Sequence, residues 1–222
     1  MRMGIFDILG PVMVGPSSSH TAGAVRIGFI TLKLLGEQPV EAQILLHGSY
    51  ASTGSGHGTD RAIVAGLLGM KSDDENIPNS FEIAKRRGLH FTFGKTVLRG
   101  VHPNTALLRV RGAGGRELEV VASSPGGGRI RVCSIDGIET NFCGDCPTLI
   151  VHNIDQPGHV AQVTAMLAGQ GVNIAAMQLY RNRRGGYAVM VVECDQKIPA
   201  DSLDILKKEP GIIKVTYLNF DE

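Results

Sequence analysis

Two segments of the chain place hydroxyl and imidazole side chains beside glycines, a composition suited to binding an anion and moving a proton. The first is GPSSSHT, residues 15–21. Unpaired N–H groups at a helix N-terminus bind anions, and neighbouring hydroxyls add donors. The ordinary pKa of histidine lies near neutrality, so His20 could act as a general acid or base. The alternative is a serine helix cap beside a solvent-facing histidine. No Walker lysine follows, so the segment is not a nucleoside triphosphate loop.

The second segment, HGSYASTGSGHGTDRA, covers residues 47–62. Gly54, Gly56 and Gly58 alternate along it, so the backbone can approach a ligand while the side chains between them project. Its chemical groups are hydroxyls, one imidazole and one carboxylate, carried by Ser49, Ser52, Thr53, Ser55, Thr59, His57 and Asp60. The glycine spacing is not the dinucleotide-binding fingerprint. The alternative is a flexible linker, although linkers rarely run directly into an apolar helix.

The elements that must position these segments can be predicted from apolar spacing. Ala24, Ile27, Ile30 and Leu34 recur at helical intervals, and Gly36 is a typical helix end. The predicted order is a short strand or turn over 5–9, a helix over 19–35, a strand over 42–47, a loop of small residues over 48–60 and a helix over 61–69 that Thr59 and Asp60 lead.

The rest of the first half favours hairpins. Residues 71–80 are polar and predict a loop, and 79–87 predict a short helix. From residue 90 to residue 141, alternating apolar runs are joined by glycine-rich turns at 112–115 and 126–128. This pattern is typical of antiparallel strands. The first half is therefore expected to be an α+β domain.

The last 75 residues read as strand, helix, strand, strand, helix, strand. This βαββαβ order is the ferredoxin-like split motif. The predicted strands cover 148–153, 172–180, 187–194 and 212–218, and the predicted helices cover 159–169 and 199–209.

Glycine content supports a division of the chain at this point. The chain has 222 residues and 29 glycines, about 13% against a usual ~7%. Residues 1–147 hold 23 of them and residues 148–222 hold 6. We therefore predict two domains, 1–147 and 148–222, the first rich in loops where bare backbone is needed.

Composition excludes several classes of protein. The net charge is +1 and aromatic residues make up 5%, so neither a nucleic acid nor an anionic membrane is an expected partner. The longest apolar run, residues 62–70, is much shorter than the ~20 residues that cross a bilayer. The N-terminus lacks the apolar core of a secretory signal. Four cysteines fit a reducing compartment, so we expect a cytoplasmic protein.

Cys143 and Cys146 form a C-x-x-C pair at the predicted domain boundary. Such a pair can supply half of a zinc site, but no second pair follows, and Cys133 and Cys194 are isolated. Incidental thiols are the preferred interpretation. A redox pair and a metal shared with a partner are the alternatives, and no metal ligand is assigned to this chain.

Residues 148–222 resemble an ACT domain. The resemblance rests on the turn from Asp155 to Gly158 and on the segment GQGVNIAAM, residues 169–177. It is similar to the ACT domain of phosphoglycerate dehydrogenase, which binds serine between two copies. The resemblance implies that Asn153, Asp155 and Asn173 meet the ammonium and carboxylate of a regulatory amino acid. The alternative is that Asp155 and Asn173 only shape turns and the domain only dimerises.

The motifs GPSSSHT and TG-GHGTDRA, in this order before an ACT domain, resemble the β chain of iron–sulfur-dependent bacterial L-serine dehydratase over essentially the whole chain. The resemblance implies that residues 1–147 have the allosteric-substrate-binding fold. It also implies a reaction from L-serine to pyruvate and ammonia, a [4Fe–4S] cluster whose ligands lie on a partner α chain, and a possible monovalent cation. The residues that would take part are His20, His57 and Asp60 in catalysis and Ser17, Ser18, Ser19, Thr21, Thr53 and Thr59 in substrate binding.

Two other functions remain open from the sequence. One is a stand-alone regulatory protein that binds an amino acid and has no catalytic role. The other is a relative of phosphoglycerate dehydrogenase, which the missing Rossmann fingerprint disfavours. Pyruvate formation on addition of an α chain would separate the first alternative from a catalytic subunit.

Overall fold

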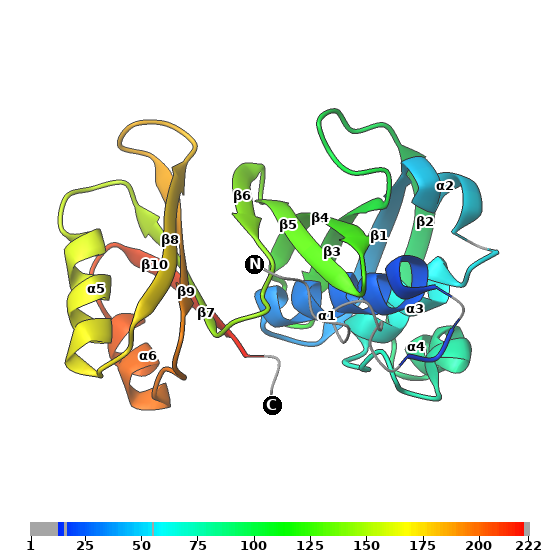
Figure 1. Ribbon diagram of the computed structural model, residues 1–222, viewed down its shortest axis with the longest axis horizontal. Helices are drawn as coiled ribbons and strands as arrows, with labels where there is room; N and C mark the ends of the chain where they lie inside the picture. Colours follow the sequence, from blue (N-terminus) through cyan, green and yellow to red (C-terminus); the bar gives the residue numbers. More distant parts are fainter. Residues whose placement is uncertain (1–12, 16, 55, 220–222) are drawn as a thin grey trace, which may run out of the picture. The chain divides into compact units, whose positions relative to one another are not determined.

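The computed structural model describes residues 13–15, 17–54 and 56–219. The chain divides into two compact units, Met1–Gly137 and Ile138–Glu222 (Figure 1). This division falls ten residues before residue 147, where the sequence predicts a boundary, and the predicted boundary stays a prediction. The strand or turn predicted over residues 5–9 lies outside the described residues.

The first sheet has the strand order β2-β1-β3-β4-β5-β6. Its strands from the first unit are β1 (Pro39–His47), β2 (His90–Thr96), β3 (Thr105–Gly112), β4 (Glu117–Gly126) and β5 (Arg129–Ile135), and the last strand, β6 (Ile138–Phe142), starts the second unit. The predicted hairpins are confirmed for β3, β4 and β5, which pair antiparallel in succession. The prediction was wrong for β2, which pairs parallel with β1. Parallel pairing needs a long crossover, and the helical segment between the two strands supplies it.

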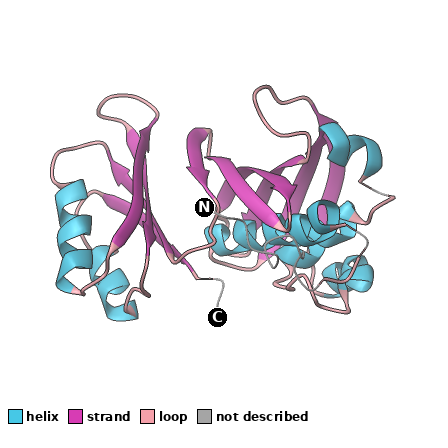
Figure 2. Ribbon diagram, viewed as in Figure 1, coloured by secondary structure: helices cyan, strands magenta, loops and turns pink. Residues whose placement is uncertain are grey.

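The helices of this unit lie on one side of the sheet, apart from the short α2 at its end (Figure 2). They are a π-helical turn η2 (Ser18–Ala22), α1 (Gly23–Leu35), α2 (Gly48–Thr53), α3 (Thr59–Leu67), a 3₁₀ turn η3 (Ile77–Asn79) and α4 (Ser80–Arg86). The helix predicted over 19–35 is confirmed. It ends at Gly36 with a φ of 78°, a left-handed conformation that glycine adopts without strain.

The loop predicted over residues 48–60 is wrong in its first half, where α2 forms. Small residues usually indicate a loop, but residues 48–53 form a helical turn. The hydroxyls of Thr53 and Ser52 both donate to the carbonyl of Ser49, over 2.9 Å and 3.2 Å. These hydroxyl-to-carbonyl bonds form only once the backbone is helical, so the sequence alone does not reveal them.

Two glycines bring α1 and α3 unusually close together. A Cβ atom on Gly28 would lie 2.1 Å from the carbonyl oxygen of Ile63, and one on Gly66 would lie 2.0 Å from that of Val25. Only bare backbone fits these positions. Since α3 also packs against η2, this contact keeps η2, which carries part of the first motif, beside α3, whose first residues belong to the second motif.

The second unit is a four-stranded antiparallel sheet with the order β10-β7-β9-β8 and two helices on one face (Figure 1). Its elements are β7 (Thr148–Ile154), α5 (His159–Gly169), β8 (Ile174–Arg181), β9 (Tyr187–Cys194), α6 (Ala200–Leu206) and β10 (Ile212–Leu218). The order of elements confirms the ferredoxin-like βαββαβ prediction and, with the first unit, the α+β fold class. Leu149 and Met190 of the sheet pack with Val163 and Leu167 of α5 in its core.

In the described part of the chain, none of the helices combines the length and the apolar character needed to cross a membrane.

Candidate functional site

The imidazole of His20 lies among four hydroxyls that come from both sequence motifs. On one side, Nδ1 lies 3.2 Å from Ser19 Oγ and 3.5 Å from Ser17 Oγ. On the other side, Nε2 lies 3.2 Å from Thr53 Oγ1 and 3.3 Å from Ser49 Oγ. We call His20 with Ser17, Ser19, Ser49 and Thr53 the hydroxyl cluster. The first motif contributes the η2 side of the ring, and the second contributes α2.

Backbone contacts hold His20 in this position. Ser17 caps η2, and its Oγ accepts the backbone N–H of His20 over 3.2 Å. Tyr50, fully buried, donates its hydroxyl to the carbonyl of Ser19 over 2.7 Å and packs edge-on against the imidazole at 5.2 Å. Burial raises the pKa of Tyr50, which keeps this donor protonated. The turn that carries His20 is thus fixed from both sides.

Ser49 and Tyr50 receive no individual role from the sequence. The available signal was the spacing of Ser49 and Thr53, which places both hydroxyls on one face if residues 48–53 are helical. Because the sequence predicts a loop there, the spacing of the two residues does not predict that their hydroxyls lie on one face. Tyr50 gives no signal, since one aromatic residue between small ones is compatible with many contacts.

His57 completes the surroundings of the ring. Its imidazole lies 5.1 Å from that of His20, between ring centroids. Partial burial, and then the charge of His57, lower the pKa of His20 below its ordinary value of 6.5. His20 is therefore mainly neutral at pH 7, the state in which an imidazole can accept a proton.

The other residues predicted for this site are close in the fold but do not bond to His20. Thr21 and Thr59 are buried, and neither hydroxyl has a hydrogen-bond partner among the described residues. Ser18 is half-buried in η2, and its carbonyl accepts the N–H of Gly23. Asp60 lies in the first turn of α3, where its carboxylate accepts the N–H of Arg61 over 2.8 Å.

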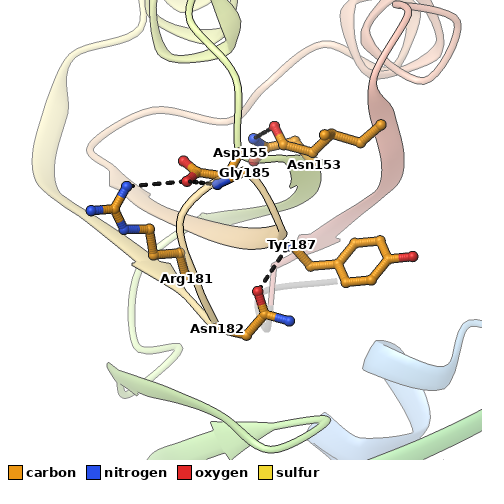
Figure 3. Close-up of polar contacts among 7 residues, drawn as sticks. Asn153, Asp155, Arg181, Asn182, Gly185 and Tyr187 are labelled. Carbon is orange, nitrogen blue, oxygen red and sulfur yellow. Dashed lines mark hydrogen bonds and ion pairs between the residues drawn. The ribbon is translucent and has the colours of Figure 1, made fainter.

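In the second unit, Asp155 ties the loop after β7 to the hairpin between β8 and β9 (Figure 3). Its carboxylate accepts the N–H of Gly185 over 2.9 Å and pairs with the guanidinium of Arg181 over 3.1 Å. The Gly185 N–H, and then Arg181, lower the pKa of Asp155. Its own N–H donates to the carbonyl of Gly186 over 2.8 Å. Asp155 is therefore ionised and engaged in a turn contact.

Asn153 lies beside Asp155, but Asn173 does not. Asn153 is buried. Its amide donates to the carbonyl of Ile154 over 2.7 Å, and its Oδ1 has no partner among the described residues. Asn173 precedes β8 and donates to Asp195 over 2.6 Å. The eight residues of β8, at ~3.3 Å each, separate it from Arg181 by roughly 25 Å. Within one chain, these three residues do not form one site.

The cysteines do not form a metal-binding set. All four are free thiols. Cys143 lies 3.7 Å from a carboxylate oxygen of Glu193, and burial together with nearby carboxylates raises the pKa of both Cys143 and Cys146. A raised pKa disfavours the thiolate that metals bind. In the part of the chain that the structure describes, no three His, Cys, Asp or Glu residues are arranged to hold a metal.

Comparison with known proteins decides the family. The family model for the serine dehydratase beta chain matches residues 4–96, and the ACT domain model matches residues 148–211. A protein of Bacillus subtilis named as a probable L-serine dehydratase, beta chain, is 42% identical over 96% of this chain and 97% of its own length. The chain belongs to the serine dehydratase beta chain family. A second beta chain, from Peptoniphilus asaccharolyticus, is 38% identical over 87% of each chain.

Membership in this family confirms the resemblance on which the sequence interpretation rested. The matched span 4–96 contains every residue of the hydroxyl cluster. A D-3-phosphoglycerate dehydrogenase of Bacillus subtilis is also similar, at 24% identity over 88% of this chain but only 37% of its own length. The similarity therefore covers only part of that dehydrogenase, a part about as long as a serine dehydratase beta chain.

Proposed function

We propose that this chain is the β subunit of an L-serine dehydratase, which converts L-serine to pyruvate and ammonia. The observation that carries the proposal is the hydroxyl cluster, a neutral histidine among hydroxyls, within the span that matches the family model. The similarity to named beta chains along nearly their whole length supports it.

The reaction needs a base for the α-proton of serine and donors for its carboxylate. A neutral imidazole is a suitable base, and we assign this role to His20, with His57 as the second acid–base group. Removal of the α-proton and loss of the β-hydroxyl as water leave aminoacrylate, which takes up water to give pyruvate and ammonia. Asp60 is the third residue that we place in catalysis.

The substrate carboxylate needs several donors at once. Thr21 and Thr59 are suited to this task because a buried hydroxyl without a partner gains most from a charged acceptor. Ser18 lies in the same turn as Thr21. We propose that these three hydroxyls bind the carboxylate, whereas Ser17, Ser19 and Thr53 act mainly on His20.

We assign the ligands of a [4Fe–4S] cluster to a partner α chain. The described donors of this chain do not fit such a group, because no three His, Cys, Asp or Glu side chains are arranged to hold a metal and Cys194 lies in the core. No step of the reaction is therefore attributed to a metal held by this chain. The proposed complex is a heteromer of α and β chains. We assign no residue of this chain to the monovalent cation that the family resemblance also implied.

We propose that the ACT domain binds a regulatory amino acid between two copies of this chain. Asn153 and Asp155 lie at one end of the sheet and Asn173 at the other, so one copy alone does not bring them together. A second copy can place its Asn173 beside Asn153 and Asp155 of the first. L-Serine is the ligand that we would try first, and self-association through this domain follows from the proposal.

Reconstitution tests the proposed function. The isolated chain should form no pyruvate from L-serine, and addition of a cluster-loaded α chain should restore pyruvate formation. His20→Gln should abolish most of the turnover while the two chains still bind. If an α chain does not bind and L-serine still binds to the isolated chain, the stand-alone regulator becomes the better interpretation.

A further inference from the structure

The position of the proton on His20 follows from counting the hydroxyl protons around its ring. A neutral imidazole has one N–H, so one nitrogen donates and the other accepts. A serine or threonine hydroxyl has one proton to donate. Where that proton already has an acceptor, the oxygen can only accept from any other neighbour. The hydrogen-bond network around His20 therefore selects one tautomer.

Thr53 is the hydroxyl that decides the tautomer. Its Oγ1 lies 3.2 Å from Nε2 of His20 and 2.9 Å from the carbonyl oxygen of Ser49, four residues earlier on α2. A carbonyl is only an acceptor, so the single proton of Thr53 is donated there. Towards His20, Thr53 can only accept. If Nε2 had no proton, its lone pair would face a lone pair of Thr53 Oγ1, which is repulsive. Nε2 must therefore carry the proton.

Ser49 agrees with this assignment. Its Oγ lies 3.3 Å from Nε2 and 3.4 Å from Oγ1 of Thr53. It can accept from the Nε2–H and donate its own proton to Thr53. The two hydroxyls of α2 then share one N–H donor, and every proton has an acceptor.

On the other side of the ring, Nδ1 is left as the acceptor. Ser19 Oγ lies 3.2 Å away. Ser17 Oγ lies 3.5 Å from Nδ1 and 3.4 Å from Ser19 Oγ, and it accepts the backbone N–H of His20. Whichever of the two serines donates to the other, the second keeps its proton for Nδ1. The neighbouring aromatic groups do not disturb this arrangement. The hydroxyl of Tyr50 is donated to the carbonyl of Ser19, and His57 meets His20 through a ring contact.

We infer that Ser49 and Thr53 are positioning residues that hold His20 as the Nε2–H tautomer, so that Nδ1 is the basic atom of the hydroxyl cluster. The role of Nδ1 in removing the α-proton of serine rests on the proposed function. The tautomer itself does not, because it follows from contacts within this chain. The family resemblance alone implied that Thr53 is a substrate ligand, and it gave Ser49 no role.

Nitrogen NMR on the full-length chain tests the inference without a partner. Long-range ¹H–¹⁵N correlation at pH 7.5 distinguishes the two tautomers, and the signal missing from His20→Gln identifies His20. We expect the proton on Nε2. Thr53→Val removes the obligate acceptor and frees Ser49 to donate, so the ratio of Nε2–H to Nδ1–H should fall about fivefold, the effect of one ordinary hydrogen bond. Thr53→Ser should restore the ratio.

Ser52→Ala is the matched control. Ser52 lies on the same helix and donates to the same carbonyl of Ser49, but it does not bond to His20, so the ratio should stay at the wild-type value. A proton on Nδ1 in the wild-type chain, or an unchanged ratio in Thr53→Val, would overturn the inference.

Turnover with an α chain separates this inference from the proposed function. Thr53→Val should lower kcat in proportion to the lost fraction of the Nε2–H tautomer, which is less than the fivefold change in the ratio, and leave the KM for L-serine unchanged. A higher KM with an unchanged kcat would instead assign Thr53 to the substrate and overturn its positioning role. If the wild-type complex forms no pyruvate while His20 is the Nε2–H tautomer, the proposed function fails and the tautomer assignment stands.

Discussion

Replacing Gly66 by alanine tests whether the close contact of α1 and α3 positions the hydroxyl cluster. The added methyl would lie 2.0 Å from the carbonyl oxygen of Val25 and 2.6 Å from the backbone N of Phe29. Unbonded heavy atoms keep about 3.5 Å apart. Because both obstacles are backbone atoms of α1, no side-chain rotation relieves the clash. The two helices must move apart by more than about 1 Å.

The expected cost can be estimated from opposing terms. Alanine is favoured over glycine inside a helix by about 1 kcal/mol. Overpacking of a close contact costs about 1–3 kcal/mol, and a contact with backbone belongs at or above the upper end. We expect a net loss of about 2 kcal/mol in the free energy of unfolding. For a unit of this size, that corresponds to a Tm lower by about 6–8 °C.

Urea unfolding followed by circular dichroism, with a calorimetric Tm, measures this loss. Gly169→Ala is the control, since Gly169 ends α5 and a Cβ there would meet nothing within 4 Å. That variant should be as stable as the wild type or more stable by about 0.5–1 kcal/mol. With an α chain, Gly66→Ala should also lower kcat by 10-fold or more, because displacements of about 1 Å cost up to about 100-fold. A Gly66→Ala protein as stable and active as Gly169→Ala would refute the reasoning.

Three further predictions follow from the contacts. Tyr50→Phe leaves the carbonyl of Ser19 without its buried donor, so urea titration should show a free energy of unfolding lower by about 1 kcal/mol. His20 has a lowered pKa, so its contribution to stability is full above pH 6.5 and is lost as the pH falls. His20→Gln should therefore reduce the slope of stability between pH 7 and 5, and an unchanged slope would contradict the lowered pKa. Asp155 also has a lowered pKa, so its contribution is present above pH 3.8 and is lost below it. Asp155→Asn should flatten the acid limb of the stability profile, and an unchanged limb would contradict the lowered pKa of Asp155.

Much of the fold follows from local patterns in the sequence. Three predictions rest on local rules, and the structure confirms each of them. They are the helix indicated by the apolar spacing after Ser19, its end at the left-handed Gly36, and the βαββαβ order of the last 75 residues. The parallel pairing of β2 with β1 is not local. The strands after residue 90 show the same alternation of apolar and polar residues whether they pair parallel or antiparallel. Only the order of the strands in the sheet distinguishes parallel from antiparallel pairing.

The candidate site was predictable as a set of residues and not as a geometry. His20, His57 and Thr53 all belong to the two sequence motifs, and their side-chain types alone indicate proton transfer and hydrogen bonding. The contact between the motifs depends on Gly28 and Gly66, whose roles appear only when two helices cross. The same limit applies to Asp155, because its bond to Gly185 joins residues 30 apart.

The most direct test of the account is the rate of pyruvate formation from L-serine by this chain with a cluster-loaded α chain, compared between the wild type and His20→Gln at pH 7.5. We predict turnover for the wild-type pair, none for either chain alone, and a loss of at least 100-fold in kcat for His20→Gln with unchanged binding of the α chain. Equal kcat values for the wild type and His20→Gln would contradict the assignment of His20 as the base.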